Sequence, residues 1–344
     1  MPADKKEPEI KMEQQIIGFS DEIDKIWKAL NTLETGRKTN IAIISEPYAG
    51  KTTLINEIER LSIKKITKIS LTKIVKNKEE LSALDNSEPI VLIDDCQYLY
   101  MRKIGGFDVL EYFLDRVVDP DKIFITTWNI FSWNYLNEIY QLDHYFPVVI
   151  KVPKFSQDMI KQLIMSRYQP DEVKFIEDVE ARNKPLIHFY MKNVKIGPFT
   201  IDMPIPEINY KNFEGLYRKK EIVAPEDVVF KKTYNVSFGN PGTAVVIWNR
   251  SLEATTIKSS KIEEPIFNID IDYSESFILS IILSMKTVSR EDLKGIAGSR
   301  EDIDKILYRL MTQGLITQDK DTYSITSEAL YSIVAYLRKS RQVI

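Results

Sequence analysis

The chain has 344 residues, of which 44% are hydrophobic and 28% charged, and its formal net charge is -3 at pH 7. This length exceeds the usual size of one domain, so two or three units are expected, each with its own core. The composition excludes a disordered or fibrous chain, and the near-neutral charge gives no general indication of a nucleic-acid partner.

Cysteine and histidine are too few to build the usual structural sites. Cys96 is the only cysteine in the sequence, so no intramolecular disulfide can form, and this usage fits a reducing compartment. His144 and His188 are far apart, which argues against a structural zinc site. Residues 1–15 lack the apolar stretch of a signal peptide and are expected to form a flexible tail. No apolar run reaches the roughly 18 residues of a membrane span, so we expect a cytoplasmic protein.

Residues 16–153 have the pattern of an α/β core. Short apolar runs alternate with helical patterns, and these runs read IAIIS, ITKISL, PIVLID, KIFITT and PVVIKV. Continuous apolar strands of this kind are buried on both faces, as in a parallel sheet covered by helices. The connecting segments, KNKEELSAL among them, carry apolar residues at three- and four-residue spacing, as crossover helices do. The sequence therefore predicts five parallel strands.

Residues 154–265 predict a helical region with an irregular insertion. The pattern is helical from about 154 to 192, and Ser156 is a candidate N-cap. Residues 193–232 are rich in proline and lack a sustained period, which indicates an irregular insertion or a hairpin. The GNPG segment at 239–242 then opens another helical run, and a polar linker ends at Pro265.

Residues 266–344 predict helices over 274–285, 289–298 and 299–314, a hairpin over 315–326 and a last helix over 327–341. Ser289 and Ser299 each precede an aspartate by three residues, as N-caps do, and Gly314 ends the third helix. Three helices followed by a two-stranded wing resemble a winged-helix domain. A small packing domain without a recognition role is the alternative.

A phosphate-binding loop is indicated by SEPYAGKTT. Backbone N–H groups at a helix N-terminus cradle phosphates, a lysine reaches their outer oxygens, and a Ser/Thr hydroxyl ligates Mg²⁺. Gly50, Lys51 and Thr52 fill these positions between an apolar strand and a helix, while Ser45 replaces the usual first glycine and Pro47 stiffens the loop. The predicted nucleotide-binding residues are Ser45, Glu46, Pro47, Tyr48, Ala49, Gly50, Lys51, Thr52 and Thr53.

Polar residues at two further strand ends complete the predicted site. Asp94 follows a buried strand and is expected to hold Mg²⁺ together with Thr52, while Asp95 is expected to orient the attacking water. Thr127 or Asn129, at the end of the next strand, is expected to contact the γ-phosphate or the water. Aspartates that only cap a turn, and ordinary turn residues at a strand end, are the alternatives.

The order of these motifs resembles that of AAA+ and STAND P-loop ATPases, and most closely the archaeal ATPase and origin-recognition-like group. The segments that carry the resemblance are IIGFSDEIDKIWKAL at 16–30, LIDDCQYLY at 92–100 and ITTWN at 125–129. The resemblance implies ATP as ligand, Mg²⁺ as cofactor, a lid at GNPG and a C-terminal winged helix. Gly242 stands where many relatives place a sensor arginine, and the next arginine is Arg250. Residues 134–152 contain no arginine for a trans-acting finger, so slow hydrolysis is expected.

DNA is a candidate partner through the third C-terminal helix (300–309) and the wing (317–324). Arg300, Lys305 and Arg309 could contact phosphates, as could the basic end at 337–342, but acidic residues lie among them, and the charges could instead pair locally. A protein partner is also open. The first hypothesis is an ATP-dependent switch that hydrolyses slowly and couples nucleotide state to the winged helix. The alternatives are a DNA-binding initiator or regulator with ATP as a structural ligand, and a non-catalytic scaffold with a degenerate loop.

Overall fold

The structure is a computed structural model, and it describes residues 16–31, 39–177, 187–196, 199–208, 224–265, 267–298 and 301–343. The tail predicted at residues 1–15 lies outside these ranges, as do Ser299 and Arg300. No helix in the described part of the chain is both long and apolar enough to span a bilayer.

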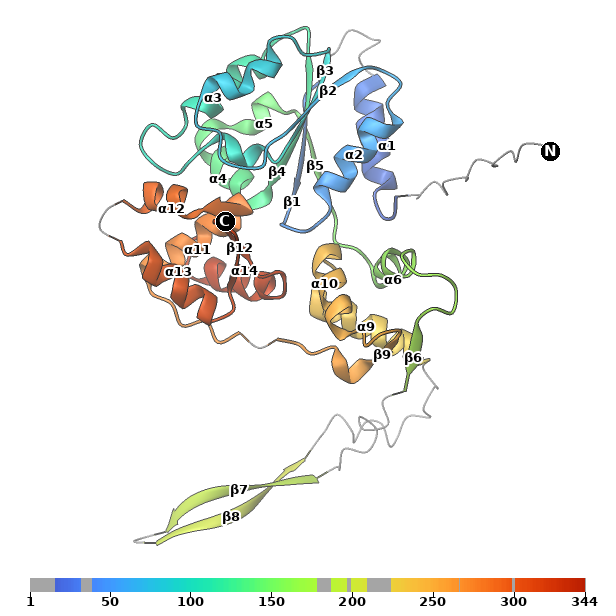
Figure 1. Cartoon of the computed structure of the whole chain (residues 1–344), viewed down its shortest axis with the longest axis vertical. Coiled ribbons are helices and arrows are strands. Elements are labelled where there is room, and N and C mark those ends of the chain that lie inside the picture. Colours follow the sequence, from blue (N-terminus) through green and yellow to red (C-terminus); the bar gives the residue numbers. More distant parts are fainter. Residues whose placement is uncertain are drawn as a thin grey trace, which may run out of the picture.

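A five-stranded parallel sheet forms the first unit (Figure 1). Its strands are β1 (Ile41–Ser45), β2 (Ile66–Ser70), β3 (Ile90–Asp94), β4 (Ile123–Asn129) and β5 (Val148–Lys151). Their order across the sheet is β2-β3-β4-β1-β5, and all neighbours are parallel. Every residue of β1, β3 and β4 is buried, as continuous apolar strands require. The predicted α/β core is confirmed.

Helices cover both faces of this sheet (Figure 1). One face carries α1 (Ser20–Asn31) and α2 (Lys51–Leu61), and the other carries α3 (Asp108–Val117), α4 (Ile130–Tyr140) and α5 (Leu142–Tyr145). Alternate strand residues supply the two cores: Ile41 and Ile43 pack with α1 and α2, whereas Ala42 and Ile44 pack with α3 and α4.

The crossover between β2 and β3 differs from the prediction. Its KEELSAL segment forms the 3₁₀ helix η2 (Lys78–Leu84), where the backbone N–H of Asn77 donates to the carboxylate of Glu80 at 3.1 Å. A second 3₁₀ helix, η3 (Cys96–Leu99), follows the acidic end of β3. The apolar spacing of this segment suits either type of helix, and the prediction of a crossover α-helix here was wrong.

Residues 154–265, which we call the lid, contain three helices and a small parallel sheet in their described part. Its elements are α6 (Gln157–Met165), β6 (Lys174–Ile176), α9 (Pro225–Ser237), α10 (Pro241–Ser251) and β9 (Thr256–Lys258), which pairs with β6. Ser156 caps α6 as predicted, because its hydroxyl accepts from the backbone N–H of Met159 at 3.2 Å. Phe230 and Trp248 stack at 5.2 Å between ring centroids and fix α9 against α10.

The middle of this region contains less helix and more strand than predicted. The expected helical pattern up to residue 192 ends at α6, since β6 follows, and β7 (Ile187–Ile196) pairs antiparallel with β8 (Phe199–Ile208). A hairpin was one of the two structures predicted for the insertion, but its first strand begins at Ile187, before the predicted start at residue 193. The predicted insertion extends too far at its C-terminal end, to residue 232, because α9 already begins at Pro225. Proline is well suited to the first turn of a helix.

The C-terminal unit, residues 267–298 and 301–343, combines helices with a three-stranded sheet. Its elements are α11 (Tyr273–Met285), β10 (Thr287–Ser289), α12 (Arg290–Ala297), α13 (Ile303–Thr312), β11 (Ile316–Asp319), β12 (Thr322–Ile325), the 3₁₀ helix η5 (Ser327–Ala329) and α14 (Leu330–Lys339). The sheet order is β10-β12-β11, and β10 was not predicted. Ser289 caps α12 as expected, whereas α13 starts after Asp302, whose carboxylate accepts from the N–H of Lys305 at 3.2 Å.

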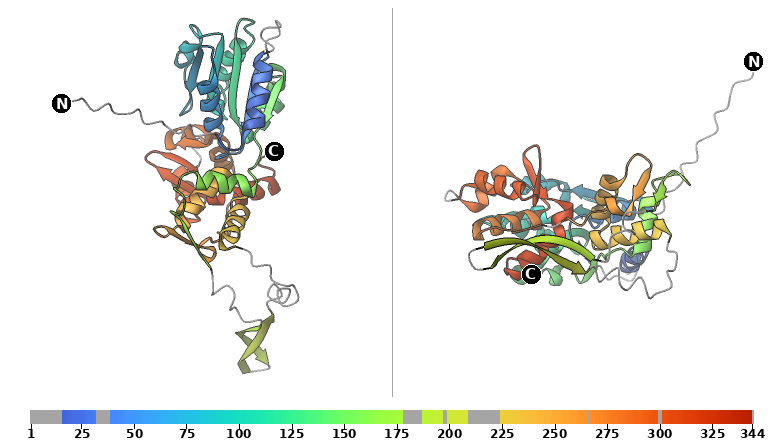
Figure 2. Two further views of the ribbon diagram at one scale, coloured as in Figure 1. Left: turned by 90° about the vertical axis from the view of Figure 1, so that its right-hand side faces the viewer. Right: turned by 90° about the horizontal axis from the view of Figure 1, so that it is seen from below.

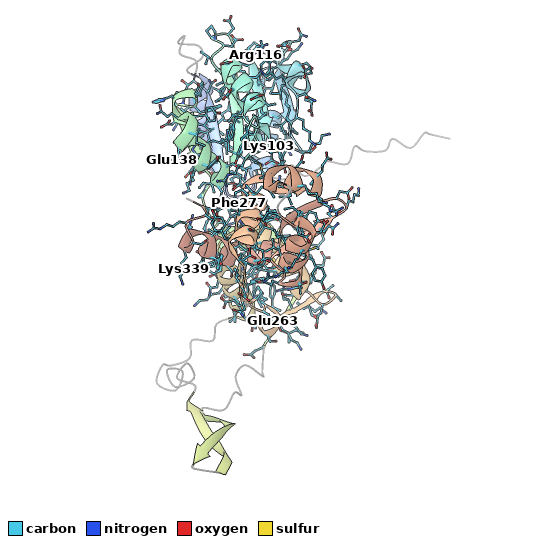
Figure 3. All side chains as sticks on the ribbon, turned by 90° about the vertical axis from the view of Figure 1, so that its left-hand side faces the viewer. Lys103, Arg116, Glu138, Glu263, Phe277 and Lys339 are labelled. Atoms are coloured by element: carbon cyan, nitrogen blue, oxygen red, sulfur yellow. The ribbon has the colours of Figure 1, made fainter. Side chains whose placement is uncertain are left out.

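The lid and the C-terminal unit both lie at the carboxyl ends of the core strands (Figures 1 and 2). Figure 3 places Phe277 of α11 where the C-terminal unit meets the core, and Arg116 at the opposite end of the core. The guanidinium of Arg102, from the core, lies 5.9 Å from the centre of the Phe277 ring. Ligands bind at the carboxyl ends of the strands in open α/β sheets. We therefore look for the nucleotide site between the core, the lid and the C-terminal unit.

Candidate nucleotide site

The phosphate-binding loop connects β1 to α2 and depends on Gly50. Gly50 precedes the first residue of α2 with φ of +93°, a conformation that favours glycine. A Cβ at this position would also lie 2.9 Å from the Phe19 ring. The predicted glycine is therefore required by both backbone conformation and space.

Lys51 is buried at the start of α2, and its ammonium contacts neutral oxygens. Its Nζ donates to Ser45 Oγ at 2.9 Å and lies 3.3 Å from the carbonyl oxygen of Glu46. Burial lowers the pKa of Lys51 to about 8, an effect that the charge of Asp95 opposes. A buried cation whose hydrogen-bond acceptors are all uncharged is suited to receive an anion from outside the chain.

Ser45 has a different place in the loop from the one its motif position suggested. It ends β1 in extended backbone and is buried, and its hydroxyl donates to the carbonyl of Glu46 at 2.9 Å while it accepts from Lys51. The positive φ values of the loop fall instead on Tyr48, at 64°, and on Gly50, at 93°. The serine therefore orients the lysine without the backbone strain that a positive φ would cause.

The acidic pair at the end of β3 is held by the neighbouring strand. The hydroxyl of Thr127, on β4, donates to the carboxylate of Asp94 and accepts from the backbone N–H of Asp95 at 2.8 Å. Both aspartates are buried. The sequence placed Thr127 at the γ-phosphate, but in this structure its hydroxyl positions the two aspartates.

Asn129 also has its polar side-chain atoms engaged. Its Oδ1 caps α4 by accepting from the N–H of Phe131 at 3.1 Å, and its Nδ2 donates to the carbonyl of Leu283, in the C-terminal unit, at 2.7 Å. Strand pairing sets Asn129 directly beside Ser45 of β1. The role of Asn129 at the γ-phosphate remains a prediction, because one N–H of its Nδ2 is used by Leu283 and the other is not assigned.

Asp95 is bound by two residues that sequence reasoning missed. Gln97 Nε2 donates to Asp95 Oδ1 at 2.8 Å, and Lys286 Nζ, from the C-terminal unit, lies 2.6 Å from Asp95 Oδ2. Burial lowers the pKa of Lys286, but the charge and hydrogen bond of Asp95 outweigh it and hold this pKa above the usual value. Gln97 follows the acidic pair closely and could have been considered; Lys286 is 191 residues away and gave no signal.

A cavity of about 1180 Å³ opens beside the loop, slightly above the roughly 300–1,000 Å³ typical of small-molecule sites. It lies between the N-terminal segment, the loop with α2, and the lid. Its walls are formed by Ile16, Ile17, Phe19, Tyr48, Gly50, Thr53, Asn56, Glu57, Arg60, Phe155, Gln162, Leu163, Ser166, Arg167, Pro241, Gly242 and Val245. Mostly apolar walls that meet a helix N-terminus can accommodate a base and a phosphate chain together.

The lid contacts the loop where a sensor arginine was expected. The N–H of Gly242 donates to the carbonyl of Tyr48 at 3.0 Å, and Asn240 Nδ2 donates to the carbonyl of Pro47 at 2.8 Å. A Cβ on Gly242 would lie 2.7 Å from both Cβ and O of Tyr48, so no larger residue fits. Arg250, the next arginine, lies 3.0 Å from Glu328 of the C-terminal unit instead.

Thr52 and Asp94 offer oxygen ligands of the kind that Mg²⁺ prefers, and their magnesium site remains a prediction. Thr52 is exposed in the first turn of α2, and the Asp94 carboxylate lies at the end of β3. Within the described ranges, no group of three or more His, Cys, Asp or Glu side chains is placed to hold a metal. Mg²⁺ needs no such group, because one or two side chains, water and substrate phosphates complete its shell.

One of the basic residues predicted to contact DNA, Arg309, is paired within the C-terminal unit: it lies 2.9 Å from the buried carboxylate of Glu275. Two further basic residues of this unit, which were not among the predicted DNA contacts, are paired as well. Arg290 forms two hydrogen bonds with Asp304, and Lys294 lies 3.4 Å from the same carboxylate. These pairs join different helices, unlike the pairs within one helix that the sequence suggested. DNA binding through 300–309 and 317–324 remains a prediction.

Strand order, loop and acidic pair together define the class of fold. A parallel sheet ordered β2-β3-β4-β1-β5, a Gly-Lys-Thr loop between β1 and α2, and aspartates after β3 form an α/β P-loop fold that resembles that of AAA+ ATPases. The sequence motifs predicted this resemblance.

Comparisons with known proteins find similarity in solved structures alone. No protein-family model and no curated protein matches the sequence. The RuvB Holliday junction branch migration motor of Thermotoga maritima is 15% identical, over 92% of this chain and 95% of its own, with a TM-score of 0.42. Cdc6p from Pyrobaculum aerophilum is 13% identical over 96% of both chains, with a TM-score of 0.41. The Walker-type ATPase of Pyrococcus abyssi is 12% identical over 93% of this chain and 96% of its own, with a TM-score of 0.44. Similarity at this level transfers neither an activity nor a partner.

Proposed function

We propose that the protein is a Mg²⁺-dependent ATP-binding switch that hydrolyses ATP slowly and couples the nucleotide to the position of its C-terminal unit. The observation that carries this proposal is the buried Lys51 ammonium, whose hydrogen bonds reach only neutral oxygens, in a loop whose Tyr48 and Gly50 line the cavity beside the lid. Burial lowers the pKa of Lys51, and the negative charge of a bound phosphate would oppose this effect.

Each residue of the site has a distinct part in the proposed reaction. Lys51 and the backbone of the loop bind the phosphates, and Thr52 with Asp94 would hold Mg²⁺, which supplies charge neutralisation on the phosphate oxygens. Asp95 positions the attacking water and accepts its proton. Thr127 keeps the two carboxylates in place through its paired hydrogen bonds.

Coupling to the rest of the chain follows from contacts made by the loop and by β4. The hydroxyl of Tyr48 donates to the carbonyl of Ile325 in β12 at 2.6 Å, and Asn129 donates to the carbonyl of Leu283 at the end of α11. A rearrangement of the loop or of Asn129 around the γ-phosphate therefore changes contacts of the C-terminal unit. Such differential contacts are what a nucleotide needs to shift a conformational equilibrium.

Binding and turnover of Mg-ATP test this proposal. We expect millimolar Mg-ATP to raise the melting temperature of the wild type and of Asp95→Asn, but not of Lys51→Met, because ligands stabilise only a state that binds them. Turnover should be measurable for the wild type and lost in both variants. Lys64→Met, at an exposed lysine beyond α2, is the matched control and should behave as the wild type. Equal turnover in all four proteins would refute the proposal.

A further inference from the structure

The segment Leu283–Thr287, at the junction of α11 and β10, contacts the core where β3 and β4 end. Four hydrogen bonds join it to the ends of β3 and β4 and the residues after them. Besides Asn129 to Leu283 O, Ser132 Oγ donates to Ser284 O at 2.7 Å, and the hydroxyls of Tyr98 and Thr287 lie 2.5 Å apart. The fourth is the ion pair between Lys286 and Asp95 at 2.6 Å. The C-terminal unit thus contacts Asn129 and Asp95, two residues that we assign to the reaction.

Lys286 has a backbone conformation that only its surroundings can hold in place. Its φ is 74° and its ψ is -57°, the conformation at the centre of a strained γ-turn and unfavourable for lysine. Asp95, its partner, is also left-handed, with φ of 61° and ψ of 47°. Strained residues that persist in a native structure concentrate at sites and switches, where release of a contact relaxes them.

The ion pair occupies the carboxylate that the reaction needs. Gln97 binds one oxygen of Asp95 from within the core, and Lys286 binds the other from the C-terminal unit. In this state Asp95 Oδ2 is held by the Lys286 ammonium rather than by an attacking water, which a general base must contact directly.

Nucleotide binding is not obstructed in the same way. All residues that line the large cavity lie between positions 16 and 245, so none belongs to the C-terminal unit. We therefore expect the part of ATP that lies in this cavity to bind while Lys286 still holds Asp95. In this arrangement the contact between Lys286 and Asp95 would obstruct hydrolysis but not the binding of the nucleotide.

We propose that Lys286 is an inhibitory latch: it holds Asp95 until the C-terminal unit withdraws, so that the protein stores bound ATP and hydrolyses it only after release. This inference rests on the proposed function, because it assigns Asp95 to hydrolysis. It adds a regulatory residue outside the core, and a means by which a partner of the C-terminal unit would trigger turnover.

Two substitutions remove the latch in different ways. Lys286→Met deletes the charge and keeps the strained backbone, whereas Lys286→Gly deletes the charge and relieves the strain, so that at least one variant should fold well. Lys294→Met is the matched control, since it removes a lysine of the same unit that pairs with Asp304 instead. A released state that is populated at about 0.1–10% in the wild type would become dominant, so kcat should rise about tenfold or more.

The measurements are kcat and the Kd for Mg-ATP in the intact chain. We expect both Lys286 variants to raise kcat while Kd stays within about twofold, and Lys294→Met to match the wild type. Asp95→Asn combined with Lys286→Met should return to background, because the gain depends on the freed carboxylate. Amide hydrogen exchange of residues 278–289 should also accelerate in the Lys286 variants.

The failures of the two proposals are distinguishable. Intact Mg-ATP binding with an unchanged or lower kcat in both Lys286 variants overturns the latch and leaves the switch standing. Absence of Mg-ATP binding in the wild type overturns the switch, and the latch with it.

Discussion

Replacing Lys51 by methionine should stabilise the protein in the absence of nucleotide. The pKa of this lysine falls from the ordinary 10.5 to about 8 because the folded chain buries its charge. At about 1.4 kcal/mol for each pKa unit, the protonated side chain destabilises the fold by about 3 kcal/mol at pH 7. Methionine keeps the packed methylene groups and loses the hydrogen bonds of the ammonium, worth about 1 kcal/mol in net terms. Ser45 Oγ retains the carbonyl of Glu46 as a partner. The expected gain is about 2 kcal/mol.

The pH dependence of this gain has a definite sign. Because the pKa of Lys51 is lower in the folded state, the unfolded state binds more protons between pH 8 and 10.5, and the wild type becomes relatively more stable as pH rises through this window. The destabilisation by Lys51 is complete below about pH 8 and vanishes above the unfolded value. The advantage of Lys51→Met should therefore be largest at pH 7 and shrink markedly by pH 9.5.

Thermal unfolding of both proteins at pH 7.0 and 9.5, without and with millimolar Mg-ATP, is the assay. A gain of about 2 kcal/mol corresponds to a rise of about 4–8 °C in Tm for a unit of 150–250 residues. Mg-ATP should then raise the Tm of the wild type only. A Tm of Lys51→Met at or below that of the wild type at pH 7, without nucleotide, would refute the reasoning about a buried, uncompensated charge.

Three further outcomes are expected. The affinity of the wild type for Mg-ATP should fall by about tenfold from pH 8 to 9.5, because free Lys51 loses its proton there; isothermal titration checks this, and Lys51→Met should lack the effect. Gly242→Ala should weaken Mg-ATP binding, since its Cβ would meet the backbone of Tyr48 at 2.7 Å, whereas Gly295→Ala, with only a lysine tip at 3.8 Å, should bind normally. Thr127→Val should reduce kcat more than binding and cost about 1–3 kcal/mol in denaturant unfolding, as both aspartates lose a hydrogen bond; an unchanged kcat would contradict its positioning role.

The parts of the site that the sequence predicted are those formed by neighbours along the chain. Gly50 and Lys51 follow a buried strand and open a helix, so motif and local structure coincide. Asp94 was placed correctly at a strand end because four apolar residues before an acid permit few other structures. The caps at Ser156 and Ser289 are local in the same sense, since each bond spans three residues.

The parts that the sequence did not predict depend on contacts between distant segments. Lys286 reaches Asp95 only because α11 ends against β3, and its positive φ has no signature in a lysine. Gly242 was interpreted as a missing arginine, whereas the close approach of Tyr48 explains why this position is a glycine. The helix α9 was missed for a different reason: its prolines were counted as breakers, although Pro225 stands in the first turn, where proline is tolerated.

Tyr48 connects the loop to both neighbouring parts. Its carbonyl accepts from Gly242 of the lid, its hydroxyl donates to Ile325 of the C-terminal unit, and its own φ is 64°, a value that surrounding contacts must maintain. Phosphates that change the conformation of the loop would therefore change its contacts with the lid and with β12 through Tyr48. In the proposed reaction, hydrolysis would be connected to the C-terminal unit through the ion pair between Lys286 and Asp95. Binding and turnover would then act on the same unit through two separate contacts, which would allow the bound and the hydrolysed states to position it differently.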